Sequence, residues 1–102
     1  MKSTSTHSNS EKEDKALARF AKALGHSTRI AILRHLENQS CCFTGDLVEV
    51  LPLAQSTISQ HLKELKNAGL IKGELNPPKI RYCINKENWK KAKVLFEGFF
   101  EG

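Results

Sequence analysis

The stretch from Asp46 to Ile71, DLVEVLPLAQSTISQHLKELKNAGLI, decides the fold of this chain. Its first part has the apolar spacing of a short helix, with Thr44 as the expected N-cap. Pro52 ends that helix because a proline ring cannot continue the hydrogen-bond ladder. A second helix follows at once over residues 54–68, and Gly69 stands where a left-handed terminating residue belongs. A turn this short makes the two helices cross at a steep angle, which predicts a helix-turn-helix.

The N-terminal half of the second helix carries short or amide-bearing polar side chains. Gln, Ser and Thr read base edges, and a recognition helix presents its N-terminal residues to the major groove of DNA. A helix face that is only solvated usually alternates Glu with Lys, although a few Ser or Thr residues alone could merely cap the helix. The predicted DNA contacts on this helix are Gln55, Ser56, Thr57, Ser59, Gln60, His61 and Lys63.

A basic hairpin is predicted directly after this helix. Leu70-Ile71 and residues 80–84 have the composition of two strands, and Asn76-Pro77-Pro78 forms a rigid turn between them. A projecting basic hairpin beside a helix-turn-helix suits contact with phosphate or with the minor groove. We therefore add Lys79 and Arg81, which lie on the returning strand, to the predicted DNA contacts.

The rest of the chain supplies three more helices. Residues 1–10 are polar and are expected to form a disordered tail. Helices are expected over about 11–24, 27–37 and 86–100, where apolar residues recur at helical spacing. The expected fold is mainly α with a small β-hairpin, a winged helix-turn-helix of about five helices plus a two- or three-stranded wing. Residues 11–102 would form this one DNA-binding and dimerisation domain.

Composition and charge narrow the classes of function. The chain has 102 residues, with 16 Lys and Arg against 11 Asp and Glu, and a formal net charge of +5. Charge of this sign favours polyanionic partners such as double-stranded DNA. No apolar run reaches the ~20 residues that span a bilayer, and the polar N-terminus lacks a secretion signal, so we expect no membrane partner and a cytoplasmic location. The sequence has no glycine-rich phosphate loop and no nucleophile elbow, which argues against an enzyme.

Over residues 15–100 the sequence resembles the ArsR family of winged-helix repressors. The resemblance is carried by ALGHSTRIAILRHL (residues 23–36), by the stretch 46–71, and by IRYCIN (residues 80–85) with the helix after it. It implies a homodimer joined through the first and last helices, an operator that overlaps the repressed promoter, and release from DNA when an effector binds. The many aromatic residues of the last helix also favour a dimer. The predicted interface residues are Leu17, Phe20, Leu24, Trp89, Phe96, Phe99 and Phe100.

Three cysteines, Cys41, Cys42 and Cys83, form the candidate effector site. The metalloid-binding pattern of the family, Glu-Leu-Cys-Val-Cys-Asp-Leu, is absent, because Phe43 and Gly45 stand where its two cysteines would fall. The His-containing site of the family is absent as well, because the C-terminal segment has no His. In winged-helix folds the segment before the third helix commonly forms a strand beside the returning wing strand, which would bring Cys83 near the vicinal pair. Three such thiolates would suit trivalent arsenic or antimony as the inducer, and no other cofactor is expected.

Other roles for these cysteines stay open. They could form a thiol redox or persulfide switch, or they could be small buried hydrophobes. A disulfide is not expected in a chain without a secretion signal. Adjacent residues on a strand point to opposite faces, so without a bend only one of Cys41 and Cys42 could join Cys83. A protein-interaction module on the same scaffold is the alternative to a repressor, although such modules usually lose the polar helix face and the basic wing.

Overall fold

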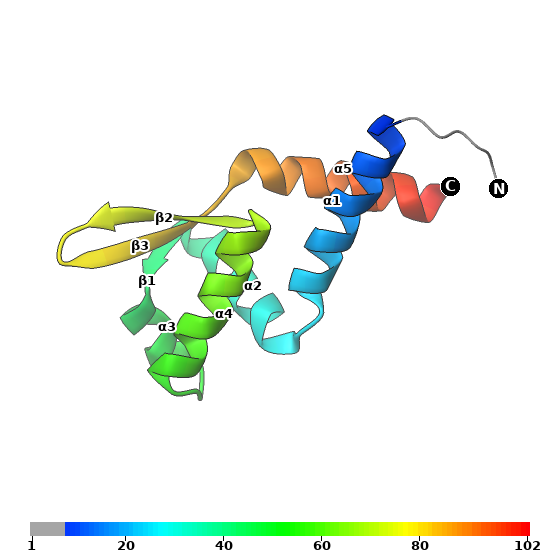
Figure 1. Ribbon diagram of the computed structural model, residues 1–102. Coiled ribbons are helices and arrows are strands. Elements are labelled where there is room, and N and C mark those ends of the chain that lie inside the picture. The colour runs from blue at the N-terminus through cyan, green and yellow to red at the C-terminus, as the bar shows by residue number, and fades with distance from the viewer. Residues whose placement is uncertain (1–7) are drawn as a thin grey trace.

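The computed structural model of the protein describes residues 8–102. These residues form five helices and a three-stranded antiparallel sheet. In chain order the elements are α1 (Ser8–Leu24), α2 (Ser27–Gln39), β1 (Cys41–Phe43), α3 (Thr44–Val50), α4 (Gln55–Ala68), β2 (Ile71–Asn76), β3 (Lys79–Ile84) and α5 (Lys86–Glu101). The β2–β3 hairpin projects to one side of the helices, while α1 and α5 lie in contact on the other side (Figure 1). The predicted winged helix-turn-helix is confirmed.

α1 begins earlier than the sequence predicts. The polar segment over residues 1–10 was expected to be a disordered tail, but α1 starts at Ser8. The prediction is therefore wrong for the last three residues of that segment, and the first seven lie outside the described residues. Glu11 lies in the first turn, where the positive end of the helix dipole favours a carboxylate. One face of α1 is buried through Ala16, Phe20 and Ala23.

Side-chain caps set the starts of α2 and α3. His26 caps α2, because its Nδ1 accepts a hydrogen bond from the backbone N–H of Thr28 at 3.1 Å. In α3, Phe43 occupies the N-cap position, and Thr44 is the first residue of the helix. The predicted cap at Thr44 is thus one residue too late. Asp46 explains the shift, because its Oδ2 reaches back to accept the N–H of Phe43 at 2.9 Å.

Gly69 ends α4 in the left-handed conformation, as predicted, with φ of 89°. Its N–H donates to the carbonyls of Leu65 and Lys66. A Cβ at this position would come within 2.8 Å of Nδ2 of Asn88. The same Nδ2 donates to the Gly69 carbonyl at 2.9 Å. The backbone conformation therefore favours glycine here, and a larger residue would also displace the Asn88 side chain.

The sheet has the strand order β1-β3-β2, with β3 in the centre. The wing is longer than predicted, because β2 continues to Asn76. At its root Ile71 pairs with Ile84, and both are buried. Towards the tip Leu75 pairs with Ile80, and these side chains are 78% and 43% exposed. The apolar stripe of the wing thus begins in the core and ends in solvent.

The core lies where the helices meet the root of the sheet. Its largest fully buried side chains are Phe20, Ile32, Leu36, Leu47, Ile58, Leu62, Leu65, Leu70 and Ile71. α4 contributes three of them at the spacing that the sequence predicts, which turns its opposite face outward. Within the described residues, no helix combines the length and the apolar character needed to cross a membrane.

Candidate nucleic-acid interface

α4 presents a polar outer face. Its buried residues, among them Ile58 and Leu62, hold the helix against the core. On the opposite side an exposed ridge follows the i, i+4, i+7, i+11 spacing of a helix. We call this the reading ridge, and it consists of Ser56, Gln60, Lys63 and Asn67. The other predicted contacts Gln55, Thr57 and Ser59 are exposed beside it. These polar side chains are placed to enter a groove without disturbing the core.

His61 does not belong to this outer face. It is 9% exposed, and its Nδ1 accepts a hydrogen bond from Nε of Arg29 at 3.1 Å. The centre of its ring lies 4.4 Å from that of His26. Burial lowers the pKa of His61 below its usual value, and the nearby His26 and Arg29 lower it further. The prediction that His61 contacts DNA is wrong, because its i+3 spacing from Ile58 turns the ring towards α2.

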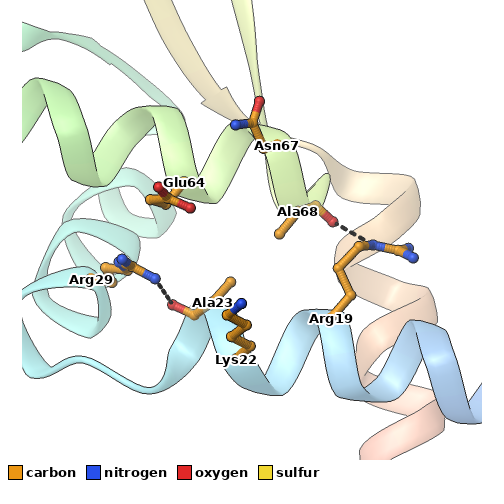
Figure 2. A pocket seen from close by; sticks show the side chains of 7 residues that line it. All are labelled: Arg19, Lys22, Ala23, Arg29, Glu64, Asn67 and Ala68. Atoms are coloured by element: carbon orange, nitrogen blue, oxygen red, sulfur yellow. Dashed lines mark hydrogen bonds between the residues drawn. The ribbon is translucent and has the colours of Figure 1, made fainter.

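Two arginines that the sequence analysis did not single out attach α4 to its neighbours. Arg19 of α1 donates from Nε to the carbonyl of Ala68 at 3.2 Å (Figure 2). This bond satisfies one of the last carbonyls of α4, which have no partner within the helix. Arg29 of α2 holds the middle of α4 through His61. The only signal in the sequence is that Arg29 lies within the segment ALGHSTRIAILRHL.

The two predicted wing contacts differ in their surroundings. Nη2 of Arg81 lies 2.6 Å from Oε1 of Glu74, its cross-strand neighbour. This hydrogen bond and charge lower the pKa of Glu74. Arg81 is therefore already paired with a carboxylate on the exposed wing. Lys79 is exposed near the tip, with its Nζ 5.4 Å from the centre of the Phe43 ring. Lys79 is the better placed of the two for a phosphate contact.

Cys41 and Cys83 form a disulfide between β1 and β3, where they are paired in register. The expectation that the chain has no disulfide is therefore wrong. Cys42 is buried in the core, because neighbouring residues on a strand point to opposite faces. Burial and then the charge of Asp46 raise the pKa of Cys42 to about 11.

The predicted site of three convergent thiolates at Cys41, Cys42 and Cys83 is wrong for the same geometric reason. Two of the three sulfurs are bonded to each other, and the third lies on the other side of β1. Within residues 8–102 no group of three or more His, Cys, Asp or Glu side chains is arranged to hold a metal ion.

The residues predicted for the dimer interface divide into core and surface. Phe20 is fully buried within its own chain, so its prediction as an interface residue is wrong. The α1 face that carries it packs into the core formed with the other helices. Phe99 and Phe100 are 64% and 77% exposed, with their ring centres 5.4 Å apart. The remaining predicted interface residues are partly buried. Leu24, Trp89 and Phe96 pack against the core, and Leu17 is partly exposed on α1.

An outward polar ridge on the second helix of a tight helix pair, with a hairpin beside it, defines a winged helix-turn-helix DNA-binding protein. The profile of the bacterial regulatory proteins of the arsR family matches residues 26–72. The HTH-type transcriptional regulator CmtR of Mycobacterium tuberculosis (strain H37Rv) is 33% identical over 82 residues, which are 80% of this chain and 69% of the relative. The chain belongs to the ArsR family of transcriptional regulators.

Solved structures support the same assignment of fold. An ArsR-like transcriptional regulator from Rhodococcus sp. RHA1 superposes with a TM-score of 0.74 at 26% identity, covering 85% of this chain and 81% of that one. The homodimeric winged helix-turn-helix DNA-binding domain from Mycobacterium bovis superposes with a TM-score of 0.74 at 20% identity. That superposition covers 97% of this chain and 92% of the Mycobacterium bovis domain.

Proposed function

We propose that this protein is a homodimeric transcriptional repressor whose α4 reads an operator in the major groove. The observation that carries the proposal is the reading ridge. Its polar side chains are exposed along one line of α4, while the opposite face of the helix is locked in the core. Amide and hydroxyl groups on such a helix match the donor and acceptor pattern of base edges. The protein would repress by occupying DNA that overlaps a promoter.

The exposed aromatic residues of α5 support a dimer. Phe99 and Phe100 lie in the last turn of α5 near the partly buried Phe96, whose ring centre lies 6.4 Å from that of Phe100. Apolar groups of this size rarely stay in water on a small protein unless they bind a partner. The fold neighbour from Mycobacterium bovis is homodimeric. A two-fold dimer would place two copies of α4 in major grooves about 34–36 Å apart, so the operator should be a near-palindrome.

Selection from a random duplex library followed by electrophoretic mobility shift tests this proposal. We expect a palindromic site whose half-sites are about one helical turn apart. The variant Phe100→Ser should raise the dimer dissociation constant at least about tenfold, since burying one phenylalanine contributes about 1.5–3 kcal/mol. The control Leu75→Ser removes an equally exposed side chain from the wing tip and should leave sedimentation unchanged. Failure to select any sequence would favour the protein-interaction module instead.

The disulfide supports a thiol-redox signal as the effector. Cys41 lies in the strand that leads into α3, and Cys83 lies in the central strand of the wing. The bond therefore connects the strand that precedes α3 to the wing, and α3 and the wing strand β2 are the neighbours of α4 in the chain and in contact with it. Its formation from two thiols would release two protons and two electrons, which a hydroperoxide would take up as it is reduced to an alcohol and water. We infer that the disulfide form is released from the operator.

The test compares operator affinity before and after reduction with dithiothreitol. The expected change is about 5–150-fold, the usual scale of coupling between two sites. Cys83→Ser should remove the response, and Cys42→Ser is the matched control that should keep it. Equal affinity of the oxidised and reduced wild-type protein would leave the disulfide without a regulatory role.

A further inference from the structure

A basic cavity lies between α1, α2 and α4, beside the reading ridge (Figure 2). Its volume is about 400 Å³. Three cationic side chains and one carboxylate line it, together with an amide and two alanines: Arg19, Lys22, Arg29, Glu64, Asn67, Ala23 and Ala68. Three positive charges against one negative charge make this a place where an anion is favoured.

The cations of the cavity are oriented but not neutralised. Arg19 donates from Nε to the carbonyl of Ala68, and within residues 8–102 its two terminal nitrogens make no hydrogen bond. Arg29 is held by its bonds to His61 and to the carbonyl of Ala23. Within the described residues, the ion pairs are those that join Glu74 to the two cations of the wing. The guanidinium groups are therefore preorganised donors whose charge has no carboxylate partner.

The positive charge continues along α1. Lys12, Lys15, Arg19 and Lys22 follow the spacing i, i+3, i+7, i+10 and are all exposed. They form one basic stripe that ends at the cavity. Asn67 connects the cavity to the DNA-reading surface, because it lines the cavity and also belongs to the reading ridge. The cavity and the reading ridge therefore adjoin each other at Asn67.

We propose that this cavity binds a phosphate of the DNA backbone next to the groove that α4 enters. The inference rests on the proposed DNA-binding function and adds an anchoring site to it. Lys22 and the free guanidinium nitrogens of Arg19 and Arg29 would donate to the phosphate oxygens. The continuity with the reading ridge favours a backbone phosphate over a free small anion. Contacts to phosphate position a protein on the duplex without reading sequence.

Salt dependence of binding tests the proposal without a known operator. The probe is a mixed-sequence duplex of about 30 base pairs, and the readout is the slope of log affinity against log salt concentration. The side chain of Lys22 is exposed and makes no hydrogen bond to the part of the chain that the structure describes, so Lys22→Ala should fold normally. It should lower the slope by about 0.9, as for one lost phosphate contact. Lys90→Ala is the matched control, because it removes an exposed lysine of α5 outside the cavity.

The variant Arg19→Lys separates the effect of the positive charge on DNA binding from the effect of the hydrogen bond on stability. It keeps the positive charge but loses the Nε bond to Ala68, so it should keep the wild-type slope even where it lowers the melting temperature. A wild-type slope for Lys22→Ala, or an equal fall for Lys90→Ala, would overturn the inference. The inference would also be overturned if Lys22→Ala bound duplex DNA normally but no longer bound inorganic phosphate. That result would show that the cavity binds a small anion. If the wild-type protein bound no duplex at all, the proposed function itself would fail, and this inference with it.

Discussion

Arg29 and His61, 32 residues apart in the sequence, are joined by a hydrogen bond from Nε of the arginine to Nδ1 of the histidine at 3.1 Å. The bond connects α2 to the recognition helix α4 at its middle. It requires a neutral imidazole, because a protonated ring has no lone pair left to accept the N–H. The position of α4 is thereby coupled to the protonation of a buried side chain.

We expect stability to fall as His61 gains a proton. Its pKa in the folded protein is lowered by burial, by His26 and by Arg29, so the unfolded chain binds the proton more tightly. The stabilisation is therefore complete above the unfolded pKa of about 6.5 and is lost as pH falls through the lower folded value. Thermal melts between about pH 7.5 and pH 5 should show a decreasing melting temperature. His61→Gln should flatten this dependence, while His35→Gln, which leaves the contact intact, should not.

Gly69→Ala should destabilise the protein by about 1–2 kcal/mol, because an L-residue pays that cost in the left-handed conformation. The added Cβ would also press on Asn88. Gly45→Ala is the control, since its Cβ would meet nothing within 4 Å and its backbone is helical. Chemical denaturation of the two variants measures the difference. Equal stability would show that the end of α4 tolerates another conformation.

Gln60→Ala should weaken operator binding by about 1–3 kcal/mol while leaving binding to unrelated DNA unchanged, as for the loss of one base contact. In the described structure Nε2 of Gln60 donates to Oε2 of Glu64 at 3.2 Å, so this amide would change its partner on binding. Lys79→Ala should instead weaken both kinds of DNA alike. Anisotropy titrations with the selected operator and a scrambled duplex separate the two outcomes. If both variants lost affinity for the operator and for the scrambled duplex equally, the assignment of Gln60 to a base contact and Lys79 to a phosphate contact would be refuted.

Cys42 should resist alkylation in the folded protein. Its thiol is buried and its pKa is raised to about 11, so hardly any reactive thiolate exists near pH 8. After mild reduction, the partly exposed Cys41 should react with iodoacetamide first, whereas Cys42 and Cys83, which are both 4% exposed, should react only after denaturant is added. Mass spectrometry of the modified peptides gives the order. Early labelling of Cys42 would contradict its place in the core.

Several parts of the structure could be predicted from the sequence because they depend on local chemistry. Pro52 and Gly69 act on their own stretch of backbone, so the α3–α4 turn and the end of α4 were predicted correctly. The Asn85 cap of α5 is local in the same way, since its side chain accepts the N–H of Asn88 three residues later. The outer face of α4 followed from the 3.6-residue period of its buried side, beginning at Ile58.

Other features were decided only by the tertiary structure. Periodicity places His61 at the border of a helix face, but only the packing of α2 against α4 supplies Arg29 as its partner. The sequence indicated Phe20 as apolar without showing that its own chain would cover it completely. Arg19 meets a carbonyl 49 residues away. The sequence determined the local features, such as helix ends, caps and the buried face of a helix. The tertiary structure decided which distant groups became its neighbours, because burial and hydrogen bonding depend on packing between elements rather than on local conformation.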